Sequence, residues 1–324
     1  MKNFNLVATL HLMIVYVVWG STFYGVKLAL EGGLTPFYLI GFRFLIAGSV
    51  LYLLSRFGGL RAATPTEWKE AGLLSFLLLV CGAGLVAWSQ RFISSSLAAL
   101  LVASSPVWVT LLDPEQKLTL RKWVGLLLGL GGVGSLVGAS LSFDREGFLW
   151  GCLGCLASGV AWAFGSLRAR RTTREIPPMA GAGMQMICAG LALLVLALSS
   201  GRPLVLEAIS VQAWAAWLYL TFIGSLLAYS SYTWLVGNTS AALASTHAYI
   251  NPVVAVLLGS LLGGESLSLT TMLAAAVALS GVIILMLPEP SSRPAPVPED
   301  YVPGGILRYS KAARRARRQF RRAS

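Results

Sequence analysis

The chain has 324 residues, of which 56% are hydrophobic and only 12% are charged, and its mean hydropathy is +0.72. A soluble domain carries about 25% charged residues, so this composition excludes a cytosolic enzyme, a disordered chain, a fibrous protein and, with four cysteines, a disulfide scaffold. The net charge of +12 does not indicate a nucleic-acid-binding domain, because much of it lies at the C-terminal end, from Arg308 onward.

Apolar runs of about 20 residues, the length that crosses the hydrocarbon core as a helix, recur along the chain. They are bounded by charges or by turn-forming residues, and the connecting segments are short. The runs are continuous rather than alternating, which disfavours a membrane barrel. We therefore expect an all-α, polytopic membrane protein with ten transmembrane helices, at 6–29, 35–56, 68–91, 94–113, 119–141, 146–168, 177–200, 212–236, 239–263 and 268–287.

The lysines and arginines favour one orientation. If the N-terminus and the loops after even-numbered helices share a side, that side carries 20 of the 25 basic residues and the other carries four. Cytoplasmic loops are enriched in Lys and Arg. We therefore expect a bacterial inner (plasma) membrane protein with both termini cytoplasmic and no cleaved signal peptide.

The tail, 288–324, is Pro-rich and then strongly basic. Such a composition predicts an extended segment followed by a basic helix that binds anionic lipid at the cytoplasmic surface. We expect no nucleic-acid partner for it.

The chain also contains an internal repeat. At one constant spacing and without a gap, Trp88 aligns with Trp234, and Ser94 to Pro106 with Ser240 to Pro252. The repeat unit is five helices, an odd number, so the second copy must enter the membrane from the opposite side. We predict two inverted five-helix repeats, at 1–143 and 144–287. This geometry serves alternating access, with the solute between the halves.

Three short motifs carry a family resemblance. The stretch WGSTF at 19–23 resembles the WG[ST]-x-F signature of EamA-domain proteins of the drug/metabolite transporter superfamily, FRFL at 42–45 resembles its second-helix element, and GESL at 264–267 resembles its "GE-x-L". The resemblance covers 6–287. Within the superfamily the chain is most similar to the ten-helix bacterial exporters of amino acids and metabolites, of which the YddG-type aromatic amino-acid exporters are one branch. The resemblance implies export of amino acids, aromatic ones included, or of related metabolites or drugs.

One segment departs from the family pattern. The residues DPEQ at 113–116 replace the apolar end and the "GE" expected after the fourth helix. The fourth helix is therefore expected to be short or to end irregularly, and no family role carries over to Glu115.

The carboxylates argue against a membrane-embedded enzyme. All 13 lie at helix ends, in loops or in the tail, whereas a metal-dependent transferase needs clustered acids. A proton relay built on carboxylates has no candidate either. We expect no catalytic residue, no cofactor and no metal site. The alternative function is a sugar-phosphate or nucleotide-sugar exchanger, which would need more than one cation at the midplane.

Arg43 lies well inside a predicted helix, whereas the other basic residues lie at helix ends, in loops or in the tail. It lies about eight residues into the second helix, roughly 12 Å deep, where an unpartnered charge costs several kcal/mol. Either it holds an anionic group such as an amino-acid carboxylate, or it snorkels or pairs with helix-end carbonyls. Gln185 occupies the equivalent position in the second repeat.

The ninth predicted helix carries two polar residues on one face. His247 and Asn251 are spaced i, i+4, just before Pro252. They either line the cavity, with His247 available for proton coupling, or form an interhelical hydrogen bond. Aromatic side chains within spans could stack on an apolar solute. The predicted substrate-binding residues are Trp19, Arg43, Trp162, Gln185, His247, Tyr249 and Asn251.

Two small-residue patterns concern packing. Gly125 and Gly129, spaced i, i+4 in the fifth helix, allow a close helix contact, either inside the protein or across a dimer. We expect a monomer or a weak dimer. Cys152 and Cys155 are interpreted as small packing residues rather than zinc ligands, because four ligands are not found together.

Overall fold

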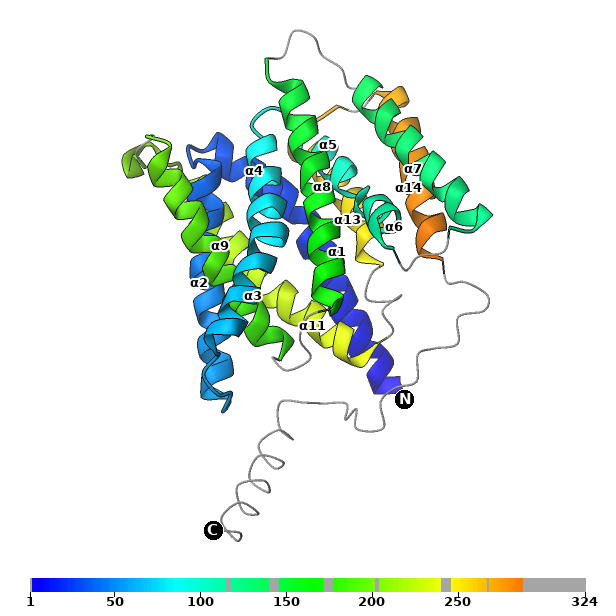
Figure 1. Ribbon diagram of the computed structural model, residues 1–324. Helices are drawn as coiled ribbons and strands as arrows, with labels where there is room; N and C mark the ends of the chain where they lie inside the picture. Colours follow the sequence, from blue (N-terminus) through cyan, green and yellow to red (C-terminus); the bar gives the residue numbers. More distant parts are fainter. Residues whose placement is uncertain are drawn as a thin grey trace, which may run out of the picture.

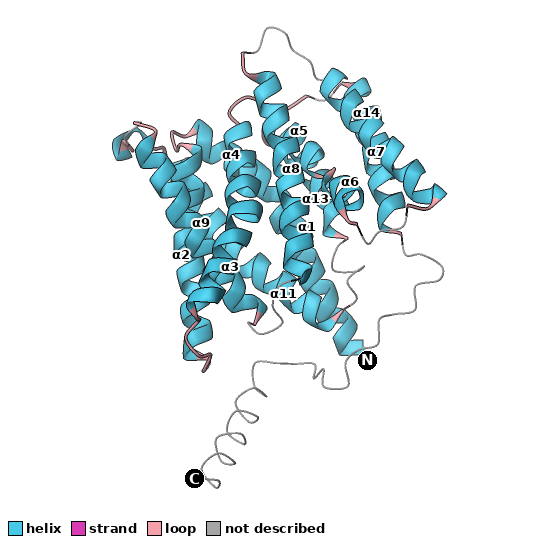
Figure 2. Cartoon of the chain, in the orientation of Figure 1, coloured by secondary structure: helices cyan, strands magenta, loops and turns pink. Residues whose placement is uncertain are grey.

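The computed structural model describes residues 2–114, 118–139, 146–171, 177–201, 204–239, 246–266 and 268–287. Within these ranges the regular structure is entirely helical, and Figure 2 shows the helices joined by short loops. The predicted lipid-binding tail at 288–324 lies outside the described residues, as do Glu115 and Gln116 of the irregular segment.

In the described part of the chain, eight helical segments are long and apolar enough to cross a membrane, and two shorter apolar helices follow them. The prediction of an all-helical, multi-pass membrane protein is therefore confirmed. The uninterrupted spans are α1 (Lys2–Glu31), α2 (Pro36–Phe57), α7 (Leu120–Ala139), α8 (Phe148–Arg171) and α9 (Pro178–Ser199). The shorter helices are α13 (His247–Leu261) and α14 (Leu269–Met286).

Three spans are built from more than one helical piece. The third combines α3 (Pro65–Ser75), the π-helix η1 (Phe76–Gly84) and α4 (Leu85–Ser89). The fourth combines α5 (Ser95–Val102) and α6 (Ser105–Leu112). The eighth follows a short 3₁₀ turn, η2 (Leu206–Ala208), and combines α10 (Val211–Leu218), the π-helix η3 (Tyr219–Leu227) and α11 (Ala228–Asn238).

Capping residues in the loops fix where several helices begin. The Thr64 hydroxyl accepts from the backbone N–H of Glu67, and the Glu67 carboxylate accepts from the N–H of Thr64, so α3 opens with a capping box. Ser210 accepts from the N–H of Ala213 and caps α10. Ser94 and Ser268 cap α5 and α14 in the same way. Each cap satisfies a backbone donor that would otherwise lack a partner at a helix end.

Helices α2 and α9 lie side by side at one edge of the bundle, and α7 and α14 lie side by side at the other (Figure 1). Glycine allows the first pair to approach closely. A methyl group added at Gly48 would lie 2.7 Å from the backbone N of Ile187, and one added at Gly190 would lie 2.6 Å from the backbone N of Leu45. The spacing along the chain from Gly48 to Gly190 equals that from Leu45 to Ile187. The two contacts are therefore reciprocal, as at a two-fold interface.

The pair α7–α14 follows the same rule. A methyl group at Gly132 would clash with the backbone of Ala278, and one at Gly281 would clash with the backbone of Gly129. The spacing from Gly129 to Ala278 equals that from Gly132 to Gly281, so these contacts are reciprocal as well. A methyl group at Gly125 would meet the carbonyl of Gly281. Gly125 and Gly129 therefore serve helix packing inside the protein, one of the two alternatives that the sequence left open.

We predict that Gly48→Ala destabilises the protein, although alanine is the better helix former. The added methyl group would lie 2.7 Å from backbone atoms of α9, and overpacking of this kind costs about 1–3 kcal/mol. The measurement is the apparent unfolding temperature in detergent, followed by tryptophan fluorescence.

The matched control is Gly72→Ala in α3, where an added methyl group would have no atom within 4 Å. We expect this control to be neutral or stabilising, since replacing Gly by Ala in a helix gains about 1 kcal/mol. Equal changes in the unfolding temperature of the two variants would contradict the claim that close packing of α2 on α9 requires glycine at position 48.

Candidate functional site

Trp19 of α1 lies in an aromatic group with side chains from the other end of the chain. Its ring centroid is 5.1 Å from that of Tyr232 in α11 and 5.0 Å from that of His247 in α13. The Tyr232 and His247 rings are 5.4 Å apart. The indole Nε1 donates to the carbonyl of Gly224 in η3 at 3.3 Å. Two aromatic rings and an imidazole thus meet at the contact between α1 and the last third of the chain, and rings of this kind can stack on an apolar or aromatic solute.

The close approach of α1 and α13 depends on the residue that follows Trp19. A methyl group at Gly20 would lie 2.6 Å from Cβ of Val254. The glycine of the WGSTF motif therefore lets α13 approach α1 and brings His247 against the Trp19 indole.

Arg43 is buried and binds the residue of η3 that follows Gly224, the partner of Trp19. Its side chain is 9% exposed, and its Nε donates to the hydroxyl of Ser225 in η3 at 2.8 Å. Its Cζ lies 5.4 Å from the centre of the Phe44 ring. Among the described residues, no aspartate or glutamate forms an ion pair with Arg43. Within the described part of the chain, this buried guanidinium contacts a hydroxyl and a ring, and its remaining N–H groups are donors suited to an anionic group.

The two π-helices lie at matching points of the chain. Each has nine residues, and the spacing that aligns Trp88 with Trp234 aligns Phe76, which begins η1, with Phe222 inside η3. π-Helical turns are frequent at functional sites. Here η3 carries the carbonyl that Trp19 binds and the hydroxyl that Arg43 binds. It also carries Tyr219, whose hydroxyl lies 2.6 Å from that of Ser21.

Trp162 of α8 packs next to Gly82 of η1. A methyl group at Gly82 of η1 would lie 3.5 Å from Cε3 of Trp162, and the Trp162 side chain is 43% exposed. Trp162 therefore lies against η1, while Trp19 lies against η3. The Trp19 group itself is formed with Tyr232 and His247.

The other predicted site residues have different surroundings. Asn251 lies one turn after His247 in α13, and its buried Oδ1 has no hydrogen-bond partner among the described residues. Gln185 is half-buried in α9. The side chain of Tyr249 lies outside what the structure describes. Sequence reasoning missed Tyr219 and Ser225, since a hydroxyl inside an apolar run carries no positional signal.

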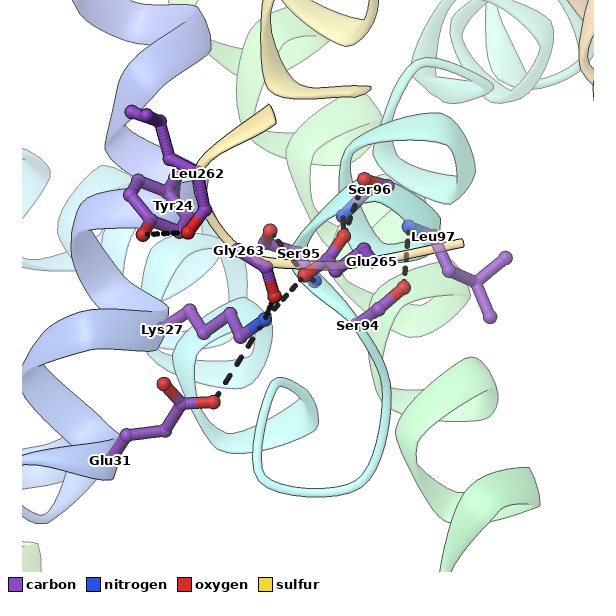
Figure 3. Close-up of polar contacts among 10 residues, drawn as sticks. All are labelled: Tyr24, Lys27, Glu31, Ser94, Ser95, Ser96, Leu97, Leu262, Gly263 and Glu265. Atoms are coloured by element: carbon purple, nitrogen blue, oxygen red, sulfur yellow. Dashed lines mark hydrogen bonds and ion pairs between the residues drawn. The ribbon is translucent and has the colours of Figure 1, made fainter. Parts of the chain in front are cut away.

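A second polar cluster ties three parts of the chain together, and we call it the clasp: Lys27, Ser95, Ser96 and Glu265 (Figure 3). Glu265 follows α13 and reaches the first turn of α5. Its Oε1 accepts from the backbone N and the hydroxyl of Ser95 at 2.9 and 2.7 Å. Its Oε2 accepts from the backbone N of Ser96 at 3.0 Å and from the Ser96 hydroxyl. Lys27 at the end of α1 donates to Oε1 at 3.1 Å.

The clasp is electrostatically favourable. A carboxylate at a helix N-terminus binds free backbone N–H groups and the positive end of the helix dipole. Burial works to raise the pKa of Glu265, but the hydrogen bonds from Ser96 and Ser95 outweigh it and lower the pKa to about 2. Glu265 is therefore ionised at all physiological pH values.

The described residues contain no group of three or more His, Cys, Asp or Glu side chains that could hold a metal ion. Cys152 and Cys155 are buried and pack with Ile93, Leu97 and Phe148 in one apolar cluster.

A helical bundle with this many apolar spans, and with a cation and aromatic rings in its interior, is a multi-pass membrane protein. The model of the EamA-like transporter family matches residues 6–138 and 149–287. The chain belongs to the EamA-like transporter family, which confirms the family resemblance of its motifs and indicates a membrane transporter rather than an enzyme.

Relatives agree with this assignment. The chain is 35% identical over 280 residues to the uncharacterized inner membrane transporter YedA of Escherichia coli K12, covering 85% of this chain and 89% of the relative. It is 27% identical to an uncharacterized transporter of Synechocystis, covering 87% and 91%. One crystal structure, 21% identical, has the same fold with a TM-score of 0.59 over 86% of this chain and 95% of that one.

We predict that Glu265→Gln lowers the free energy of unfolding by about 1.5–3 kcal/mol, which is the usual contribution of a hydrogen bond to a charged group. Because the pKa of Glu265 is depressed from 4.5 to about 2, the stabilisation is complete above about pH 4.5 and is lost as the pH falls toward 2. The measurement is the apparent unfolding temperature of both proteins across this range.

Glu207→Gln is the control, since Glu207 is exposed in η2. The difference in apparent unfolding temperature between the native protein and Glu265→Gln should become smaller as the pH falls. The control should have the unfolding temperature of the native protein at every pH. A difference in unfolding temperature that stays constant down to pH 3 would contradict the claim that the ionised carboxylate of Glu265 stabilises the clasp.

Proposed function

We propose that this transporter exports small organic solutes, amino acids with an apolar or aromatic side chain or related metabolites, from the bacterial cytoplasm by alternating access. The observation that carries the proposal is that Trp19 meets Tyr232 and His247 and that Trp19 and the buried Arg43 bond to adjacent residues of η3. An aromatic surface beside a cation matches a solute with an apolar body and a carboxylate. The site would comprise Trp19, Arg43, Trp162, Gln185, His247, Tyr249 and Asn251.

We further propose that the chain consists of two inverted repeats, at 1–143 and 144–287. The reciprocal glycine contacts in both α2–α9 and α7–α14 support a two-fold axis between the repeats. The matching π-helices of the third and eighth spans support it as well. Inverted repeats can exchange conformations, so that one arrangement is open to each side of the membrane.

In the proposed topology both termini are cytoplasmic, which puts the clasp on the extracytoplasmic side. The clasp joins α1 and α5 of the first repeat to the α13–α14 loop of the second. Opening toward that side would separate Glu265 from Ser95 and Ser96. We propose that the clasp holds the transporter closed there while the solute enters from the cytoplasm.

We predict that Arg43→Gln weakens transport of carboxylate solutes about 10- to 100-fold, corresponding to about 1.5–3 kcal/mol for a charge-assisted hydrogen bond. The assay is counterflow in proteoliposomes, comparing L-phenylalanine with L-phenylalaninamide, which lacks the carboxylate. Counterflow needs no imposed ion gradient, so its result is independent of any proton coupling through His247.

Gln is the residue at the equivalent position of the second repeat, Gln185, so the variant should fold. Arg43→Lys is the matched variant that keeps the charge, and it should retain most of the preference for the carboxylate. An equal loss for both solutes in Arg43→Gln would make Arg43 a structural residue. No counterflow of any amino acid by the native protein would refute the proposed solute class.

A further inference from the structure

Four hydroxyl groups lie where α1, α2 and η3 meet, and we call them the hydroxyl cluster: Ser21, Thr22, Tyr219 and Ser225. A methyl group added at Gly224 would lie 3.3 Å from Nη2 of Arg43 and 3.2 Å from Cγ2 of Thr22. The Arg43 and Thr22 side chains therefore meet over this glycine. The hydroxyl of Ser21, the residue before Thr22, lies 2.6 Å from that of Tyr219.

The protons of the hydroxyl cluster are already engaged. A hydroxyl donates one proton and accepts through two lone pairs. Three of the four donate to backbone carbonyls in their own helices, at 2.8, 2.6 and 3.2 Å for Ser21, Thr22 and Ser225. Because Ser21 has no second proton, Tyr219 must be the donor in the hydrogen bond that they share. The cluster therefore offers lone pairs, and no further proton, to a bound solute.

Tyr219 and Thr22 hold the acceptors that remain unused. Ser21 already accepts from Tyr219, and Ser225 already accepts from Nε of Arg43. Among the described residues, none donates to the oxygen of Tyr219 or of Thr22. Both side chains are half-buried, so the protein covers only part of their surface. Hydrocarbon has no hydrogen-bond donor, so a donor for these oxygens has to come from water or from the solute.

The donors beside the cluster belong to Arg43. Its Nε is bound to Ser225, and the described part of the chain supplies no partner for its other N–H groups. A cationic donor and neutral acceptors thus lie side by side. A carboxylate offers only acceptors, and an ammonium group offers only donors. An α-amino acid carries both groups on one carbon atom and therefore complements this surface.

We propose that Tyr219 and Thr22 accept hydrogen bonds from the α-ammonium group of the solute, and so select amino acids over carboxylic acids that lack an amino group. The inference rests on the proposed function, in which Arg43 holds the carboxylate of the same solute. Neutral oxygens suit this task, because a protein carboxylate in their place would pair with Arg43 and withdraw it from the solute. The solute class is thereby narrowed to α-amino acids with a free amino group.

The test is calorimetric titration of three solutes into the full-length protein in lipid nanodiscs. L-Phenylalanine carries both charged groups, 3-phenylpropionate lacks the ammonium group, and L-phenylalaninamide lacks the carboxylate. Tyr219→Phe removes the acceptor and keeps the ring. It should weaken the binding of L-phenylalanine and of L-phenylalaninamide about 10-fold, as for a lost hydrogen bond to a charged group. The affinity for 3-phenylpropionate should stay unchanged.

Thr22→Val, which keeps the shape of the side chain, should give the same pattern and decides the question if Tyr219→Phe does not fold. Tyr24→Phe is the control, since the Tyr24 hydroxyl donates to the carbonyl of Leu262 at an exposed position. It should bind all three solutes as the native protein does. An equal loss for all three solutes in Tyr219→Phe and Thr22→Val would make these hydroxyls structural and overturn the proposal.

Arg43→Gln separates this proposal from the proposed function. It should weaken the binding of L-phenylalanine and 3-phenylpropionate, which carry the carboxylate, and spare L-phenylalaninamide. If it does so while Tyr219→Phe and Thr22→Val keep the native preference for L-phenylalanine over 3-phenylpropionate, the carboxylate site stands and the ammonium site is refuted. If the native protein binds none of the three solutes, the proposed solute class is refuted, and this inference with it.

Discussion

A polar group inside a bilayer must find its partner within the protein, because hydrocarbon offers none. Arg43 shows how this constraint organises the interior. Its guanidinium is buried in α2, and the hydroxyl that accepts from it comes from a π-helix of the eighth span. The same π-helix turns a backbone carbonyl toward Trp19. A local change in helical spacing thus supplies partners to two side chains from the first half of the chain.

The same constraint explains the edges of the bundle. Lipid provides no hydrophobic force between helices, so close packing at small residues must hold them together. Glycines at the α2–α9 and α7–α14 contacts allow backbone atoms to approach each other. The clasp acts at the helix ends, where a carboxylate binds a helix N-terminus and a lysine together. Apolar packing thus joins the halves along the spans, while charge joins them at one end.

Much of the fold could be predicted from the sequence. The second and seventh spans were expected at 35–56 and 177–200 and lie at Pro36–Phe57 and Pro178–Ser199, since proline and nearby charges mark their ends. The π-helices could not be predicted, because Phe76–Gly84 has the composition of an ordinary apolar run. The GESL motif was visible, but its partners Ser95 and Ser96 lie in the other half of the chain, and no local pattern links them. The contact of Trp19 with His247 likewise depends on a tertiary approach at Gly20.

The central claim is that the space between the halves opens to one side of the membrane at a time. Asn251→Cys, in a protein whose four native cysteines are replaced by serine or alanine, gives the most direct measurement, since the Asn251 Oδ1 has no described hydrogen-bond partner to lose. A membrane-impermeant thiol reagent is applied to right-side-out and to inverted vesicles. Alternating access predicts modification from both sides, with saturating L-phenylalanine protecting the thiol in each case. Modification from one side only, unaffected by the solute, would contradict it.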